Sequence, residues 1–329
     1  MNKNTRRLVV LTIIAAVAVA GLYWFRYRRA PEFGPISGKL VVHFLDIGQG
    51  DSELIQLPDG ETMLIDAGDH GAPTVNLLRK YGVRRIDLII ATHPHTDHIG
   101  EMRDIMRAFE VKEFWDSGFP HPTGTYTEML QEIRDQGIAF STPKQGERRM
   151  FGQVLVEVLH PAEELPDDNP NNASLVVRLT FGRKRFLFTG DSEVESWRQM
   201  METEPDKLRA DVLKAAHHGS SNGATEDVLN AVRPSIITIS CAGGNDYHHP
   251  HPKVVRMLKQ RRNAIQIYRT DLEGTITAVC DGSNIQTSTE KQVARDRLYL
   301  TGDEAAGKVV NGERSEGRSP GKRHSRRSR

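Results

Sequence analysis

The feature that most constrains this chain is a loop with four metal-binding side chains in six positions. Residues 93–98 read His-Pro-His-Thr-Asp-His and follow an apolar stretch, 86–92, that is typical of a buried strand. Pro94 and the polar residues around it end regular structure, so we expect the loop at the carboxyl end of that strand. Imidazole and carboxylate are ligands that zinc and related divalent ions prefer. This density of ligands, with further histidines downstream, favours two metal ions over one.

The loop matches the H-x-H-x-D-H signature of the metallo-β-lactamase superfamily, and further motifs extend the resemblance. In chain order they are D-I-G-Q-G-D at 46–51, D-A-G at 66–68, N-N-A-S at 171–174, F-T-G-D at 188–191, H-H-G-S at 217–220 and H-P-H-P at 249–252. In this order the series resembles the extracytoplasmic hydrolase domain of ComEC-type competence proteins. The resemblance covers roughly residues 39–282 and implies an α/β fold, the αβ/βα sandwich of that superfamily.

The pattern of apolar residues agrees with such a fold but does not define it. Short apolar runs predict strands at 40–45, 52–57, 62–66, 86–92, 154–159, 174–181, 185–189, 211–214, 236–240 and 265–268. Helical spacing predicts helices at 73–81, 101–109, 125–136, 194–201, 225–232 and 252–260. Periodicity alone distinguishes only an α/β or α+β class. The sandwich arrangement therefore comes from the resemblance.

Composition is compatible with one large domain. The chain has 329 residues and a net charge of +1, so no global field attracts nucleic acid. Cys241 and Cys280 lie in apolar, strand-like segments and are expected in the core, although a disulfide between them stays open for an exported domain. We expect the hydrolase domain at 39–288, after a linker with proline and glycine at 30–38.

The amino-terminal segment favours a membrane. Residues 8–25 form an uncharged, apolar run of 18 residues. At the rise of a helix this spans about 27 Å, close to the hydrocarbon core of about 30 Å. A small-x-small site at 18–20 is typical of a cleaved signal peptide, whereas Tyr23 and Trp24 beyond it favour a retained anchor. We expect residues 1–29 to anchor the protein with its hydrolase domain extracytoplasmic; secretion after cleavage is the alternative.

The carboxyl-terminal segment, 289–329, is polar and basic, and we expect it to be mostly disordered. Residues 303–329 contain eight Lys/Arg and four Asp/Glu among many Gly and Ser, so they cannot bury enough apolar area to fold. The final stretch, 322–329, is densely positive. It is either a solubilising tail or an electrostatic tether to nucleic acid and other anionic polymers.

The resemblance implies a set of ligands for two divalent ions, zinc or manganese. One ion is assigned to His93, His95 and His160, the other to Asp97, His98 and His217, with Asp191 as the bridge. His160 and Asp191 both come after apolar, strand-like segments. Of the adjacent pair, His217 is chosen because it comes first after its strand, and His218 is the alternative that would hydrogen-bond to a ligand.

Two residues are the expected catalytic groups. Asp97 acts through its place on the second ion. His249, held between prolines, would hold a phosphate oxygen or protonate the leaving group. A structural loop before the helix at 252–260 is the alternative interpretation of the H-P-H-P motif.

Further polar residues are candidates for contacts with ligands or substrate. They are Asp46, Asp51, Asp66, Asn172, Ser174, His218 and His251. Asp51, in a turn flanked by glycines, would orient a ligand histidine or only shape a hairpin. Asn172 and Ser174 would offer neutral donors to substrate oxygens or cap the entry to a strand.

The expected function is metal-dependent hydrolysis, with DNA outside the cytoplasm as the favoured phosphodiester substrate. Two cations lower the pKa of bound water and neutralise charge on substrate oxygens. In ComEC-type proteins the resembled domain is attached to a channel of many helices, whereas this chain has one candidate membrane segment, so DNA uptake by it is not implied. A small or cell-surface phosphodiester, and a non-enzymatic, metal-stabilised binding module, are the alternatives.

Overall fold

The structure is a computed structural model that describes residues 38–307. The expected membrane segment at 1–29 and the basic stretch at 322–329 lie outside the described residues. Between residues 38 and 307, no helix has the length and apolar character needed to cross a membrane.

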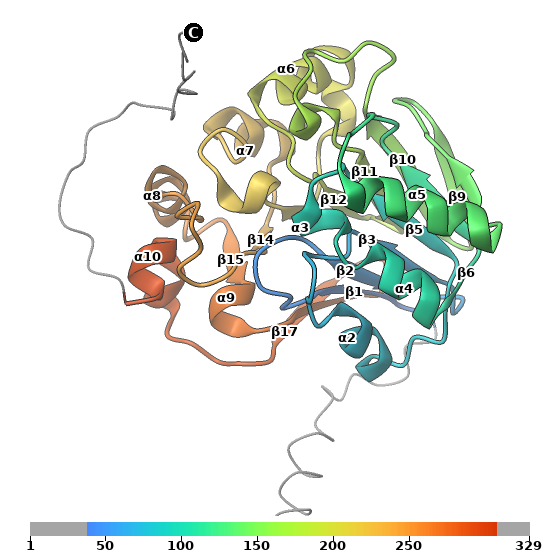
Figure 1. The fold of residues 1–329 in the computed structure, drawn as a ribbon. Helices are drawn as coiled ribbons and strands as arrows, with labels where there is room; N and C mark the ends of the chain where they lie inside the picture. Colours follow the sequence, from blue (N-terminus) through green and yellow to red (C-terminus); the bar gives the residue numbers. More distant parts are fainter. Residues whose placement is uncertain (1–37, 308–329) are drawn as a thin grey trace, which may run out of the picture.

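Two large sheets face each other (Figure 1). The first has eight strands in the order β17-β16-β1-β2-β3-β5-β7-β8. Their bounds are β1 (Leu40–Phe44), β2 (Glu53–Gln56), β3 (Thr62–Ile65), β5 (Leu88–Ala91), β7 (Glu113–Asp116), β8 (Ala139–Ser141), β16 (Ile276–Cys280) and β17 (Ile285–Thr289). β1 pairs antiparallel with β2 and β16, whereas β3, β5, β7 and β8 run parallel.

The second sheet has seven strands in the order β15-β14-β13-β12-β11-β10-β9. Their bounds are β9 (Arg148–Phe151), β10 (Val154–His160), β11 (Val176–Phe181), β12 (Lys184–Phe188), β13 (Val212–Lys214), β14 (Ile236–Ile239) and β15 (Gln266–Arg269). β12 to β15 run parallel. Their carboxyl ends therefore meet at one edge of the sheet, where ligands commonly bind. A short pair, β4 (Arg85–Ile86) and β6 (Glu110–Val111), lies apart.

Helices cover the outer face of each sheet (Figure 1). The first sheet is covered by α2 (Thr74–Lys80), α4 (Met102–Ala108) and α5 (Gly124–Gln136), and the second by α6 (Val194–Thr203), α7 (Glu226–Val232) and α8 (Pro252–Gln260). The short helices are α3 (Thr96–Ile99), η1 (Pro170–Ala173), η2 (Pro205–Lys207), η3 (Ala216–Gly219), α9 (Thr270–Glu273), η4 (Arg295–Tyr299) and α10 (Gly302–Ala305).

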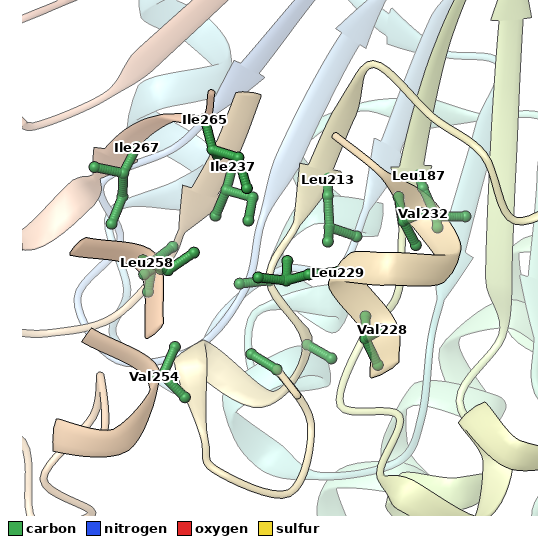
Figure 2. Packing of buried hydrophobic residues seen from close by; sticks show 14 of the residues in the cluster. Leu187, Leu213, Val228, Leu229, Val232, Ile237, Val254, Leu258, Ile265 and Ile267 are labelled. Carbon is green, nitrogen blue, oxygen red and sulfur yellow. The ribbon is translucent and has the colours of Figure 1, made fainter. Parts of the chain in front are cut away.

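Successive strand residues point into different apolar layers, as the period of two in a strand requires. In β5, Leu88 and Ile90 belong to the cluster between the sheets, while Ile89 packs beneath the helices. In the second sheet, Leu213 and Ile237 pack with residues of α7 and α8 (Figure 2). Three apolar layers separate four layers of secondary structure, which confirms the expected αβ/βα sandwich.

The folded domain extends past the expected boundary at residue 288. Leu298 and Tyr299 of η4 are buried in the cluster beneath α8. The buried guanidinium of Arg269 donates to the backbone carbonyls of Leu298 and Leu300. The disorder expected from the polar composition is therefore wrong for 289–307, because two apolar side chains and a buried arginine are enough to hold this segment.

Leu298→Ala should lower the free energy of unfolding by about 2–3 kcal/mol, since it leaves a cavity in a packed cluster. Urea-induced unfolding of the purified protein measures this. The neighbouring Arg297 is exposed, so Arg297→Ala should change stability by less than about 0.5 kcal/mol. Equal stability of the two variants would contradict the packing of η4.

Candidate metal centre

The histidine loop and the carboxyl ends of β12 and β13 come together at one edge of the sandwich. A cavity of about 890 Å³ opens there. His95, Asp97, Asp191, His218 and His249 are among its lining residues. The sequence placed these side chains on separate segments, and the structure brings them to one site.

The loop at 93–98 is a tight turn that buries two of its imidazoles. The amides of His98 and Ile99 donate to the His95 carbonyl at 3.0 and 3.1 Å, which begins α3. His93 and His98 are fully buried, with ring centres 4.1 Å apart. His98 Nδ1 donates to Asp66 Oδ2 at 2.7 Å, so its Nε2 is left to face the cavity. Asp66 thus orients a candidate ligand in the way that the sequence predicted.

Asp191 occupies the centre of the site. Its Oδ1 lies 3.3 Å from His98 Nε2. Its Oδ2 lies 3.6 Å from His218 Nε2 and 3.9 Å from His93 Nε2. The Asp191 amide donates to Ser174 Oγ at 3.1 Å, so Ser174 holds the backbone of the central carboxylate. This placement between several imidazoles suits a bridge between two ions.

The donor atoms fit divalent metal ions. His98 Nε2, His218 Nε2 and Asp191 Oδ1 are buried without a hydrogen-bond partner among the described residues, an arrangement that is costly unless another group satisfies them. Ligand atoms lie within 4.8 Å of one another in four groups: His93–His98–Asp191, Asp97–His98–His218, Asp51–Asp66–His98 and Asp51–Asp191–His218. Imidazole nitrogens with carboxylate oxygens suit zinc, manganese or iron.

The electrostatics of the cluster favour added positive charge. Burial alone would raise the pKa of Asp191, but His218 and His98 hold it well below its usual range. Burial alone would lower the pKa of His218, but Asp191 and Asp51 raise it to about 10. Asp191 and Asp66 likewise hold the pKa of His98 well above its usual range, against the effect of burial. A cluster that raises histidine pKa values so strongly also favours a divalent cation in place of the protons.

Both adjacent histidines lie beside Asp191, and the surroundings of His218, the alternative in the prediction, make it the stronger candidate for a metal ligand. His218 Nδ1 donates to the Ser240 carbonyl at 3.0 Å, so Nε2 faces Asp97 Oδ2 at 3.3 Å. His217 is partly exposed, with its Nδ1 3.0 Å from Glu193 Oε1, and belongs to none of the four ligand groups. Both histidines adopt left-handed backbone conformations, with φ of 50° and 52°. This turn brings both side chains to Asp191, with His217 Nε2 and His218 Nε2 each 3.6 Å from Asp191 Oδ2, but only His218 is fully buried among the other ligand atoms.

His160 is not brought into the metal cluster. It is fully buried, and its Nε2 donates to the Asn172 carbonyl at 2.7 Å. It belongs to none of the four ligand groups, but its Nδ1 is buried without a hydrogen-bond partner among the described residues, so its ligand role stays a prediction. His95 does lie at the site: its Nδ1 is 3.1 Å from His93 Nε2, and it lines the cavity.

Asp51 lies beside the histidines, as the resemblance implied. Its Oδ1 is 3.2 Å from His218 Nδ1, and its Oδ2 forms a buried ion pair with Lys214. The turn around it needs glycine at residue 50, where φ is 119° and a Cβ would lie 2.1 Å from the Asp97 carbonyl oxygen. The D-I-G-Q-G-D motif therefore packs against the loop at 93–98 and is more than a hairpin turn.

Two of the expected polar contacts cap helices, and a third lies away from the cavity. Asn172 Oδ1 accepts from the amides of Glu193 and Ser196, which caps the start of α6, so its side chain is not free for substrate. His251 Nδ1 accepts from the Lys253 amide and caps α8. Asp46 lies 3.9 Å from Lys291 Nζ and is not among the cavity-lining residues. Helix capping explains the positions of Asn172 and His251 better than substrate binding does. Asp46 instead faces a surface lysine.

His249 lines the cavity, and a neighbouring residue that sequence reasoning missed holds its backbone. Asn245 Oδ1 accepts from the His249 amide at 3.0 Å, and Asn245 Nδ2 donates to the His249 carbonyl at 2.6 Å. Burial, with His218 and His217, lowers the pKa of His249 to about 3. A neutral ring suits hydrogen bonding to substrate, and the expected proton-donating role stays a prediction. The sequence signal that could have indicated this role is an asparagine four residues before His249, in a loop that continues into Pro250 and Pro252.

The last short helix braces the same loop. Gly302 of α10 packs against the His249 carbonyl, where an added Cβ would lie 2.1 Å from the oxygen. His248 Nδ1 and Asp303 Oδ2 form an ion pair at 2.7 Å nearby. Tyr247, whose side chain is 63% exposed, stacks beside His249 with ring centres 5.9 Å apart. The position of His249 therefore depends on a segment about fifty residues later in the chain.

Fold and site together define a metal-dependent hydrolase. The chain belongs to the metallo-β-lactamase superfamily, whose profile matches residues 45–243. A mutant of the CmlA beta-hydroxylase shares the fold, with a TM-score of 0.50 and 17% identity, over 75% of this chain and 54% of that chain.

Curated relatives narrow the resemblance to ComEC-type competence proteins, as the motifs predicted. ComE operon protein 3 of Bacillus subtilis (strain 168) is 32% identical over 266 residues, which cover 73% of this chain and 33% of that protein. Competence protein ComA of Neisseria gonorrhoeae is 28% identical over 273 residues, which cover 80% and 35%. The chain thus spans about a third of the length of these relatives.

Metal content should separate the candidate ligands. After chelation and resupply, His218→Ala should bind about one ion fewer than the unmodified protein, because it removes a buried ligand. His217→Ala and His160→Ala should bind as many ions as the unmodified protein, and Asp191→Ala should lose both. Elemental analysis with circular dichroism as a folding check measures this. Loss of an ion in His217→Ala but not in His218→Ala would restore the sequence-based assignment.

Gly302→Ala should slow turnover while leaving metal content unchanged, since it displaces the His249 loop and not the ligands. We expect a loss of about 10- to 100-fold in kcat, the scale of a misplaced active-site group. Ala306→Ser, an exposed change in the same helix region, is the matched control. Full activity of Gly302→Ala would show that the contact between Gly302 and the His249 carbonyl does not affect the site.

Proposed function

We propose that this protein is a dinuclear phosphodiesterase that cleaves DNA outside the cytoplasm. The observation that carries the proposal is the composition of the cavity around Asp191. Histidines and carboxylates line it, and no lysine or arginine is among its lining residues. The charge of a bound phosphate would therefore be offset mainly by metal ions. This suits the single negative charge of a diester better than the double charge of a monoester, which commonly requires arginine or lysine.

The candidate ligands divide into two adjacent sets that share Asp191. His93 and His95 would hold one ion, and the second would be held by Asp97, His98 and His218. When bound, the ions supply positive charge to phosphate oxygens and lower the pKa of an attacking water.

The surrounding residues maintain this arrangement and contact the substrate. Asp66 and Asp51 direct the Nε2 atoms of His98 and His218 toward the cavity. His249 would hydrogen-bond a phosphate oxygen from the open side of the cavity. Asn171, which also lines the cavity and was missed in the sequence, would act as a second neutral contact.

An exposed aromatic ring supports nucleic acid as the substrate class. Tyr247 lines the cavity and presents its ring to solvent beside His249. Exposed aromatic side chains stack on nucleobases with little dependence on sequence. The relatives named for competence support the same class.

The proposed location remains the one expected from the sequence. The apolar run at 8–25 would anchor the chain, with the hydrolase domain on the extracytoplasmic side. Metal identity and a role in DNA uptake are not part of the proposal.

A panel of substrates tests the chemistry. With manganese or zinc, the protein should cleave single-stranded DNA and bis-p-nitrophenyl phosphate, and a chelator should abolish both activities. The monoester p-nitrophenyl phosphate and the β-lactam nitrocefin should be poor substrates. Cleavage of nitrocefin or the monoester in preference to both diesters would refute the proposed phosphodiesterase activity.

Tyr247 variants test the preference for DNA within the same panel. Tyr247→Ala should raise KM for single-stranded DNA about tenfold, the effect of losing one stacked base, and leave bis-p-nitrophenyl phosphate unaffected. Tyr247→Phe keeps the ring and should behave like the unmodified protein. An equal effect of both variants on both substrates would favour a small or cell-surface diester.

A further inference from the structure

A second polar cavity lies at the edge opposite the metal centre, where the amino ends of β12, β13 and β14 meet. Its volume is about 180 Å³. Its lining includes four arginines, Arg183, Arg185, Arg209 and Arg233, which we call the arginine pocket. The six residues that lead from Arg185 to Asp191 span roughly 20 Å of extended chain, so the pocket is well separated from the catalytic cavity.

The pocket has a large excess of positive charge. Within residues 38–307, no ion pair involves any of its four guanidinium groups. Asp211 is the carboxylate in the lining, and it already accepts from Lys184 Nζ at 2.9 Å and from the Arg185 amide at 3.0 Å. Gathering like charges in a concave surface is unfavourable unless an anion binds there.

The chemistry of the pocket matches a phosphate group. Guanidinium groups present paired donors that fit phosphate oxygens, and they do so better than ammonium groups. Arg233 also adopts a left-handed backbone, with φ of 51°, at the end of α7, where glycine or asparagine is usual. A non-glycine residue in this conformation is uncommon.

The position of the pocket indicates where the phosphate comes from. The amide of Arg183 donates to the Gly282 carbonyl at 2.7 Å, which ties the pocket to the turn between β16 and β17. β16 ends beside the start of β1, with Cys280 paired to Leu40. The described chain therefore begins at the same edge as the pocket. The twelve residues between the apolar run and residue 38 reach at most about 40 Å.

We propose that the arginine pocket binds the phosphate of an anionic phospholipid headgroup and docks this edge of the domain on the bilayer. The metal centre, at the opposite edge, then faces away from the membrane. The inference rests on the proposed membrane anchoring but not on the proposed phosphodiester chemistry.

Hydrogen exchange on the full chain in lipid nanodiscs tests the proposal. Discs of phosphatidylcholine are compared with discs that also contain phosphatidylglycerol, at low and high salt. Amides at 182–185 and 209–211 should exchange about tenfold more slowly with the anionic lipid at low salt, the scale expected for two arginines near a charged surface. Arg183→Gln/Arg209→Gln should lose this protection.

The matched control removes two exposed arginines elsewhere, Arg134→Gln/Arg148→Gln, and should keep the protection. Turnover of bis-p-nitrophenyl phosphate should be unchanged in both double variants, so a failed docking test is distinguishable from a failed hydrolase. If inorganic phosphate slows exchange of these amides in phosphatidylcholine discs and the anionic lipid has no effect, the bound phosphate does not come from a lipid headgroup. Failure of the full chain to remain with the discs, or equal protection in both double variants, would overturn the docking.

Discussion

Much of this structure depends on one buried carboxylate. Asp191 follows a central strand, and four imidazoles approach its oxygens and compensate a charge that burial would otherwise disfavour. The nearby glycine at 190 leaves no room for a side chain, since a Cβ there would lie 2.7 Å from Thr92 Oγ1. Thr92 in turn donates to Asp66, which orients His98. The close approach of Thr92 and Gly190, which follow β5 and β12, therefore helps to set the spacing of the candidate ligands.

The sequence predicted the layers well because burial has a simple signature. Short apolar runs such as those of β5 and β14 are buried on both faces when they form strands, and the H-x-H-x-D-H loop marked one edge of the sheet. The last two strands at one end of the first sheet were harder: β7 carries charged residues at both ends, and all three residues of the edge strand β8 are exposed. Their strand state comes from pairing with β5 and with each other, which local composition does not encode.

The site was predicted less completely, for reasons that are conformational. The choice between His217 and His218 as the metal ligand depends on a left-handed turn, and the sequence of two adjacent histidines does not indicate that conformation. Asn172 was expected to face substrate, but the amides of a helix that begins twenty residues later compete for its side chain. Leu298 and Tyr299 lie in a polar segment, where composition gives little warning that a single turn of helix will be buried. Tertiary contacts decide each case.

The brace between Gly302 and His249 has a consequence for biogenesis. The metal ligands come from the first two thirds of the described chain, but the loop that carries His249 is held by one of its last helices. During synthesis, the hydrolase would stay incomplete until nearly the whole domain has been made. The candidate metal ligands would therefore be complete in the nascent chain before the loop that carries His249 is held in place.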